Sequence, residues 1–234
     1  NNYRYAFSGS VSTATLDTIP KVATLSVDAG TTMEMDESNA TTTGKRITSA
    51  KLIGTLTTTA TKFTGTFDLT NWSSYDGTTN WNPNSVVFNG AISDTSVGGA
   101  GEILTGKIEV ARTNAASYNP NLPDSNSNYP AGTFTFTGTV QAPSRPLLKL
   151  VVGGVRTGLN TKTATVNYSY GTKNITGSGS ADDANPANDS MTLTNQDGIQ
   201  LVTKTGIVSK AGTKVADLAG NMVSYVDGVS ESLQ

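Results

Sequence analysis

Three aspartates in one polar loop are the residues best suited to bind a metal ion. Asp182, Asp183 and Asp189 span eight positions, and Asn185 and Asn188 lie between them with amide oxygens. Carboxylate and amide oxygens together could supply the roughly six to eight hard ligands that calcium takes. The spacing lacks the alternating acidic residues of an EF-hand loop. The pattern therefore favours a hydrated acidic loop, with calcium binding as the alternative and no other cofactor expected.

Both tryptophans of the chain lie in a second polar segment, together with a tyrosine. Trp72, Tyr75 and Trp81 are surrounded there by Asn, Ser, Thr and Asp residues. A tryptophan combines a large apolar area with a hydrogen-bond donor, so these side chains could stack on a sugar or anchor a protein contact. The favoured interpretation is that the two indoles fold inward and seal one end of a β-structure, with a contact role as the alternative.

Most other catalytic chemistry is excluded by the residue types that the chain lacks. It contains no His and no Cys, so it has no imidazole base, no thiolate nucleophile, no disulfide and none of the usual zinc ligands. Pairs of carboxylates remain possible, but Glu102 and Glu109 are seven positions apart and would lie on opposite faces of a strand. We therefore expect the protein not to be an enzyme.

The charge balance and the hydropathy pattern exclude two further classes of partner. Sixteen Lys and Arg residues stand against 18 Asp and Glu residues, which gives a net charge of -2 without a basic cluster. Nucleic-acid binding needs several cations on one face, so none is expected. The longest apolar stretch, residues 147–155, is far shorter than the roughly 20 residues of a membrane-spanning helix. We therefore expect no transmembrane segment.

Short runs of alternating residues predict an all-β protein. In the first run, Tyr3, Tyr5, Phe7, Gly9 and Val11 share one strand face, because side chains alternate with a period of two. Similar runs predict about a dozen strands. They cover residues 22–28, 46–58, 61–69, 85–93, 102–112, 132–140, 147–157, 163–170, 190–194, 199–209 and 222–226. Residues 215–226 fit a helix as well as a hairpin that turns at residues 219–221.

One local pattern recurs six times: an apolar residue, a spacer, glycine, a spacer and another apolar residue. Strand alternation puts the two apolar residues and the glycine on one face, which we expect to be the buried face. A glycine inside a strand costs about 0.5–1 kcal/mol relative to alanine, so the pattern predicts bends, bulges or aromatic rings over the bare backbone. The glycines are Gly9, Gly54, Gly65, Gly90, Gly106 and Gly138.

These features predict an antiparallel β-sandwich or a coiled β-barrel with meander-type connections. Asp-Gly dipeptides at residues 76–77, 197–198 and 227–228 favour hairpin turns. The longest stretches without a strand pattern are residues 71–85, 118–130 and 177–190. We expect a single domain over residues 1–234. The proline-containing middle stretch leaves open a division into two β units, residues 1–117 and 131–234.

The first strand also suggests a way of assembling. An extended segment with bulky residues at every second position, Tyr3, Tyr5, Phe7 and Val11 around Gly9, has the form needed to add a strand to another subunit. Head-to-tail addition of this kind need not close and leads to filaments. The favoured alternative is that this strand pairs within its own chain.

Composition suggests where such a protein works. The chain has 38 Thr, 23 Ser, 20 Asn and 24 Gly, which together make up nearly half of it. Exported eukaryotic domains usually carry disulfides, so a cysteine-free chain of this kind favours export by bacteria to the extracellular cell surface. We expect a structural or adhesive subunit that forms fibres or a surface layer with itself or with other surface proteins. The alternative is a module that binds glycans or carries a small ligand, using the tryptophan segment or a barrel interior.

Overall fold

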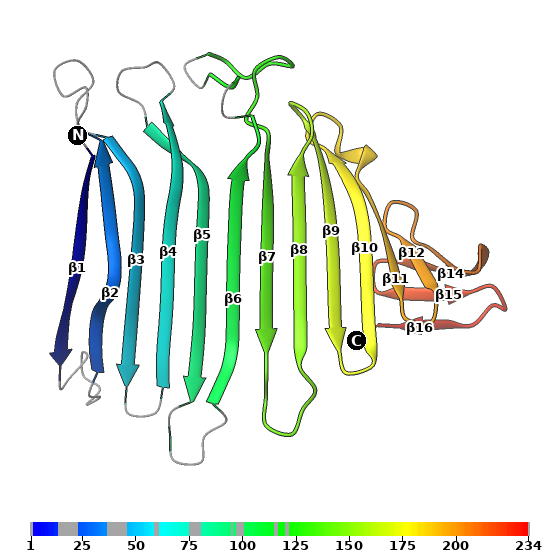
Figure 1. Ribbon diagram of the computed structural model, residues 1–234. Helices are drawn as coiled ribbons and strands as arrows, with labels where there is room; N and C mark the ends of the chain where they lie inside the picture. Colours follow the sequence, from blue (N-terminus) through cyan, green and yellow to red (C-terminus); the bar gives the residue numbers. More distant parts are fainter. Residues whose placement is uncertain are drawn as a thin grey trace.

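The chain folds into one large antiparallel sheet. The computed structural model describes residues 2–13, 23–36, 46–58, 61–74, 81–94, 96, 101–114, 117–119 and 122–233. These residues form 16 strands, and the spatial order of the strands is the same as their order in the sequence (Figure 1). A single 3-10 turn, η1, is the only helical element among them. The predicted all-β, antiparallel meander is thus confirmed.

Ten long strands are followed by six short ones. The long strands are β1 (Asn2–Thr13), β2 (Ala23–Asp36), β3 (Arg46–Thr58), β4 (Thr61–Ser74), β5 (Trp81–Asp94), β6 (Gly101–Arg112), β7 (Gly132–Val140), β8 (Leu148–Arg156), β9 (Thr161–Tyr170) and β10 (Lys173–Asp182). After η1 (Pro186–Asn188) come β11 (Ser190–Asn195), β12 (Ile199–Val202), β13 (Ile207–Lys210), β14 (Thr213–Ala219), β15 (Met222–Tyr225) and β16 (Ser230–Ser232). The last strands run across the direction of the long ones (Figure 1).

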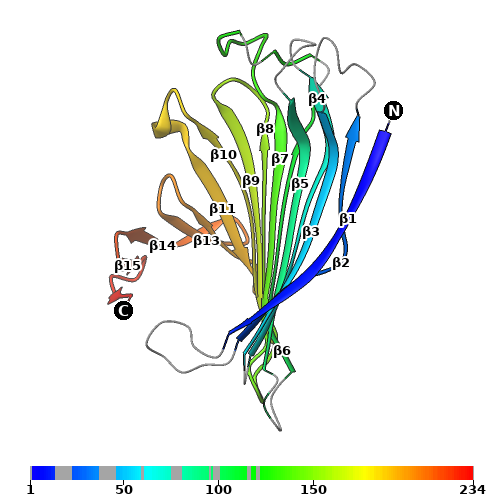
Figure 2. The same cartoon turned by 90° about the vertical axis from the view of Figure 1, so that its left-hand side faces the viewer.

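The sheet is open and consists of one twisted layer. β1 and β16 stand at opposite ends of the strand order and do not pair with each other. Viewed from the β1 side, no second sheet of described residues faces the long strands (Figure 2). Sandwich and barrel therefore stay predictions. β6 and β7 pair directly on either side of residues 118–130, so the sheet continues through the proposed domain boundary.

Strand register separates the side chains of the long strands into two faces, one rich in threonine and one largely apolar. Residues that are directly paired across antiparallel strands share a face, and neighbours along a strand alternate. One side, the threonine face, carries Thr55, Thr57, Thr64, Thr66, Thr105, Thr133, Thr135, Thr137, Thr139, Thr163, Thr165 and Thr176. The other side, the apolar face, carries Leu52, Leu56, Phe63, Phe88, Ile92, Leu104, Ile108, Val110, Phe134, Phe136, Val140, Leu148, Leu150, Val152, Val166 and Tyr168.

Five of the six repeated glycines are aligned across the sheet. Gly54, Gly65, Gly90, Gly106 and Gly138 are direct partners from each strand to the next, from β3 to β7. We call this line the glycine row. The prediction that the glycines and their apolar neighbours share one face is therefore confirmed.

Aromatic rings cover part of the glycine row, as the sequence pattern predicted. A Cβ atom added at Gly65 would lie 3.2 Å from the Phe63 ring, and one at Gly138 would lie 2.8 Å from the Phe136 ring. These rings shield the exposed backbone that glycine leaves in a strand. At Gly106, by contrast, an added Cβ would meet nothing within 4 Å. The row is thus covered at some positions and open at others.

The expectation that the apolar face is buried is not met within this chain. Phe63 and Phe88 are each 36% exposed, and Ala216 is the one fully buried hydrophobic residue among those described. The accessible surface is 14285 Å², whereas a compact monomer of 24.2 kDa exposes about 10,000 Å². The excess arises because a single layer leaves both faces of the sheet uncovered. No helix of the described residues is long and apolar enough to cross a membrane.

Several strand boundaries differ from the sequence prediction. β2 continues to Asp36, and β10 occupies residues 173–182, part of which was predicted to be irregular. β10 was missed because Gly177 and Gly179 replace the apolar residues of the usual alternation. The ambiguous segment near the C-terminus is a hairpin, with β14 and β15 paired on either side of Gly220. Turns also occur at the Asp-Gly pairs of residues 197–198 and 227–228, whereas residues 76–77 lie outside the described part.

The connection between β6 and β7 is ordered around one asparagine. Asn128 is 9% exposed, and its Oδ1 accepts a 2.8 Å hydrogen bond from the N–H of Asn119. Its Nδ2 donates to the carbonyl of Asn119 at 2.9 Å, and to those of Leu122 and Pro123 at 3.3 Å. One side chain thereby gathers the carbonyls of a proline-containing loop that has little regular structure of its own.

Candidate functional site

The N-terminal strand forms one edge of the sheet. β1 pairs with β2 along nearly its whole length, and it comes first in the strand order. The structure therefore agrees with the favoured alternative, in which this strand pairs within its own chain. Tyr3, Tyr5, Phe7, Gly9 and Val11 all lie in β1. On its outer side β1 has no partner strand among the described residues, and such an edge offers unpaired backbone groups to another strand.

A bulge in β2 interrupts the pairing near this edge. Between Phe7 and Gly9 the register shifts, so that Ser8 has no partner in β2. On the other side of β2, the hydroxyl of Thr31 accepts a 3.0 Å hydrogen bond from the N–H of Ile53 and donates to its carbonyl at 3.3 Å. Thr31 is 6% exposed. Its side chain thus satisfies backbone groups of β3 that the bulge leaves without a strand partner.

Asp28 lies within this bulge as an acceptor of two hydroxyl hydrogen bonds. Ser26 Oγ donates to Asp28 Oδ1 at 2.6 Å, and Thr55 Oγ1 donates to Asp28 Oδ2. These two bonds, with a smaller contribution from the charge of Lys62, hold the pKa of Asp28 below its ordinary value of 3.8. The ionised form is favoured because both hydrogen bonds require an acceptor.

This arrangement predicts a stability that falls in acid. A carboxyl whose folded pKa is lowered contributes stability above pH 3.8, and that contribution is lost as the pH falls through the lower folded pKa. We expect Asp28→Asn to lower the melting temperature at neutral pH and to flatten its decline below about pH 4. Thermal melts of both proteins between neutral and acidic pH measure this. An NMR titration that gives Asp28 a pKa of 3.8 or higher would contradict the assignment.

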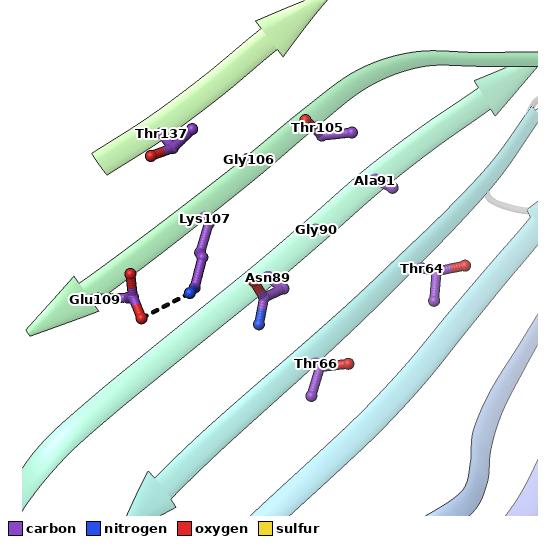
Figure 3. Close-up of a pocket in the computed structure, with 10 residues that line it drawn as sticks. All are labelled: Thr64, Thr66, Asn89, Gly90, Ala91, Thr105, Gly106, Lys107, Glu109 and Thr137. Carbon is purple, nitrogen blue, oxygen red and sulfur yellow. Dashed lines mark ion pairs between the residues drawn. The ribbon is translucent and has the colours of Figure 1, made fainter. Parts of the chain in front are cut away.

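The threonine face carries a polar hollow over β4, β5 and β6 (Figure 3). Its volume is about 480 Å³. Small residues form its floor, where Ala91 lies beside the backbone of Gly90 and Gly106. Polar side chains surround them, namely Thr64, Thr66, Asn89, Thr105, Lys107, Glu109 and Thr137.

Two contacts on the threonine face involve polar groups around this hollow. Lys107 Nζ lies 2.7 Å from Glu109 Oε1, and the hydroxyls of Thr105 and Thr139 are hydrogen-bonded at 2.5 Å. In an exposed position such an ion pair contributes little to binding or stability. The hollow offers hydroxyl, amide and charged groups to a polar ligand, but none of the residues around it provides an aromatic surface. These groups suit polar contacts with a ligand.

The tryptophan segment contains more strand than the sequence predicted. Trp72 lies in β4 opposite Pro83, and Trp81 begins β5 opposite Ser74. Only residues 75–80 separate the two strands, so residues 71–74 and 81–85 are not loop. Tyr75 and the side chains of both tryptophans lie outside the described residues. A contact or glycan-binding role for them therefore stays a prediction.

The three aspartates of the predicted acidic loop lie around η1, where their carboxylates have partners within the protein. Asp189 Oδ1 accepts a 2.8 Å hydrogen bond from the N–H of Asp182, whose own Oδ1 accepts one from Ala184 at 3.0 Å. Asp183 is ion-paired with Lys162 at 2.6 Å. No cluster of three or more potential metal-ligating side chains occurs in the part of the chain that the structure describes. Calcium binding stays a prediction.

The exposed apolar face is the candidate surface that sequence reasoning did not identify. Strand alternation predicted which residues form this face. Because the face was expected to be buried, it was not considered as a contact surface. The signal for its continuity lay in the repeated glycine pattern, which puts equivalent positions of successive strands in line. The apolar face and the β1 edge are thus the two surfaces of the sheet whose character suggests a contact.

Comparison of the chain with protein-family models, with curated proteins and with solved structures finds no match.

Proposed function

We propose that this protein is a non-catalytic structural or adhesive subunit, exported by bacteria to the cell surface, that assembles with its own copies by adding strands at its N-terminal edge. One observation carries the proposal, namely that β1 is a 12-residue strand at the end of the sheet with no partner strand on its outer side among the described residues. Composition supports the location, because the chain is rich in Thr, Ser and Asn and has no Cys.

The features that usually prevent edge-to-edge association are sparse in β1. Proteins protect edge strands by making them short or by placing prolines and charged residues in them. β1 is long, contains no proline and has a single charged residue, Arg4. Arg4 is itself partly neutralised by Glu34 of β2, with 3.8 Å between Arg4 Nε and Glu34 Oε1. Because β1 stays paired with β2, head-to-tail addition of the opposite edge of the next copy at its outer side lengthens the sheet without removing a strand from either subunit, and such addition need not close.

Replacing Ser8 by proline tests this proposal. Ser8 has no partner in β2, so a proline there removes a backbone donor of β1 with the least damage to the pairing of β1 within its own sheet. We expect the wild-type protein to form ordered polymers that grow with concentration, and Ser8→Pro to weaken this association at least about tenfold. Sedimentation velocity and electron microscopy of negatively stained samples measure the two effects.

Two further variants separate edge chemistry from misfolding. Ser8→Ala keeps the backbone N–H and should polymerise like the wild type, whereas Ser8→Lys places a charge on the edge and should resemble Ser8→Pro. Circular dichroism shows whether each variant keeps its strand content. A wild-type protein that stays monomeric at all concentrations, or polymers unaffected by both Ser8→Pro and Ser8→Lys, would refute the proposal.

A further inference from the structure

We infer that the apolar face of the sheet is covered by the same face of a second copy, so that two chains form one β-sandwich. This interface is distinct from the β1 edge and does not depend on assembly there. The predicted sandwich would thus arise between two molecules, each contributing one layer.

The composition of the apolar face fits the core of a permanent interface. Over β3 to β10 its central positions carry apolar residues and glycine, with Phe63, Phe88 and Ile108 near the middle. Charged residues at positions of this face occur only at strand ends, namely Asp94, Arg112, Arg156, Lys162 and Lys173. Depletion of charge at the centre and charge at the rim is the pattern of subunit interfaces.

The size of the face also suits a second copy. Strand spacings of about 4.8 Å and residue spacings of about 3.3 Å give the eight strands β3 to β10 a face of roughly 1,100 Å². A stable interface of ordinary size buries about 800 Å² on each partner. The protein exposes 14285 Å², about 4,000 Å² more than a compact monomer of its mass. Pairing of the two faces removes roughly a quarter of this excess from each copy.

The relief of the face is self-complementary. The glycine row is a shallow line with a row of large side chains on each side. One flanking row contains Leu56, Phe63, Ile92, Leu104 and Val140, and the other contains Leu52, Phe88, Ile108 and Phe136. Consider a second copy that is related by a two-fold axis and shifted by one row of residues. Its large side chains then lie over the open positions of the first copy's glycine row. Each copy offers both the ridge and the groove, as an isologous interface requires.

Gly106 is the position at which to test this interface. An added Cβ there meets nothing within 4 Å, so a larger side chain is tolerated by the single sheet and projects from the middle of the apolar face. We expect the wild-type protein to sediment as dimers or as assemblies of dimers. Gly106→Lys should weaken dimerisation by at least about 100-fold, because it buries an unpaired charge against the partner. Thr64→Lys, on the threonine face, is the matched control and should leave the dimer intact.

Thiol protection gives a second readout that does not depend on the lysine variant folding. The chain has no cysteine, so Gly106→Cys and Thr64→Cys each introduce a single thiol. We expect alkylation of the thiol at position 106 to be at least about tenfold slower than at position 64, because the second sheet excludes the reagent. Carrying both variants in the Ser8→Pro background removes edge polymers and leaves the face-to-face dimer. The experiment therefore distinguishes a variant that loses only the polymers from a variant that loses only the dimers.

Three results would overturn the inference. A wild-type protein that is monomeric at about 100 µM lacks an interface of this size. Equal alkylation rates at positions 106 and 64 would show that the face is open in the assembled protein. Monomers that bind phosphatidylcholine vesicles, and lose that binding with Gly106→Lys, would assign the face to lipid.

Discussion

Gly206→Ala is expected to destabilise the C-terminal strands by about 3 kcal/mol or more. Gly206 lies between β12 and β13 with φ of 69°, where an alanine costs about 1–2 kcal/mol. A Cβ atom there would also lie 2.1 Å from the carbonyl oxygen of Leu218 in β14. That oxygen is backbone, so the clash is relieved only if β13 and β14 move apart. The hydrogen bond from Leu218 N to Gly206 O, at 2.7 Å, would be strained by such a movement.

Gly212→Ala is the matched control for this effect. Gly212 also has a positive φ, 79°, but a Cβ atom there would meet nothing within 4 Å. Its alanine variant should be destabilised only by the cost of the left-handed backbone conformation, about 1–2 kcal/mol. Denaturant unfolding and hydrogen exchange of residues 199–219 compare the two variants. Equal losses at both positions would show that the approach of Leu218 does not limit the size of residue 206.

Asn128→Ala is expected to release the loop between β6 and β7. The substitution removes four hydrogen bonds from a side chain that is 9% exposed. Partners left unsatisfied cost about 1–3 kcal/mol in buried sites, and water reaches part of this loop. We expect a net loss of about 2–3 kcal/mol, which corresponds to amide exchange at Asn119 that is roughly 30- to 150-fold faster.

Two variants calibrate this result. Asn126→Ala changes an exposed asparagine in the same loop and should leave exchange at Asn119 unchanged. Asn128→Asp keeps the Oδ1 acceptor and loses the donors, so its effect should fall between wild type and Asn128→Ala. Equal exchange rates at Asn119 in Asn128→Ala and Asn126→Ala would show that the hydrogen bonds of Asn128 do not stabilise this loop.

The fold class was predictable because strand alternation is a local property. The runs that contain Phe63, Phe88 and Phe136 put apolar residues at every second position, and each of them is a strand. β10 escaped detection because its small residues make room for Val166 and Leu193, whose side chains would contact a Cβ atom at Gly177. The β14–β15 hairpin was ambiguous because an apolar residue every three or four positions fits a helix and also fits two strands joined at Gly220.

The surfaces of the sheet were harder to predict than its strands. The glycine row requires a register that brings Gly54, Gly65, Gly90, Gly106 and Gly138 opposite one another, and register depends on turns and long-range pairing. The exposure of the apolar face depends on what lies above the sheet, which a strand pattern does not encode. The first strand was identified correctly, but its position at the edge follows from the strand order, and that order is not a local property.

The agreement between chain order and sheet order affects how the molecule forms. Each strand pairs with the strands just before and after it in the sequence. The pairing of a strand therefore does not depend on a strand that is synthesised much later. Such local connectivity favours fast folding that spreads from one end. If the protein is exported as we propose, a chain that passes unfolded through a narrow pore can therefore rebuild its sheet one hairpin at a time on the far side. Each newly docked strand would then keep the translocated portion from sliding back.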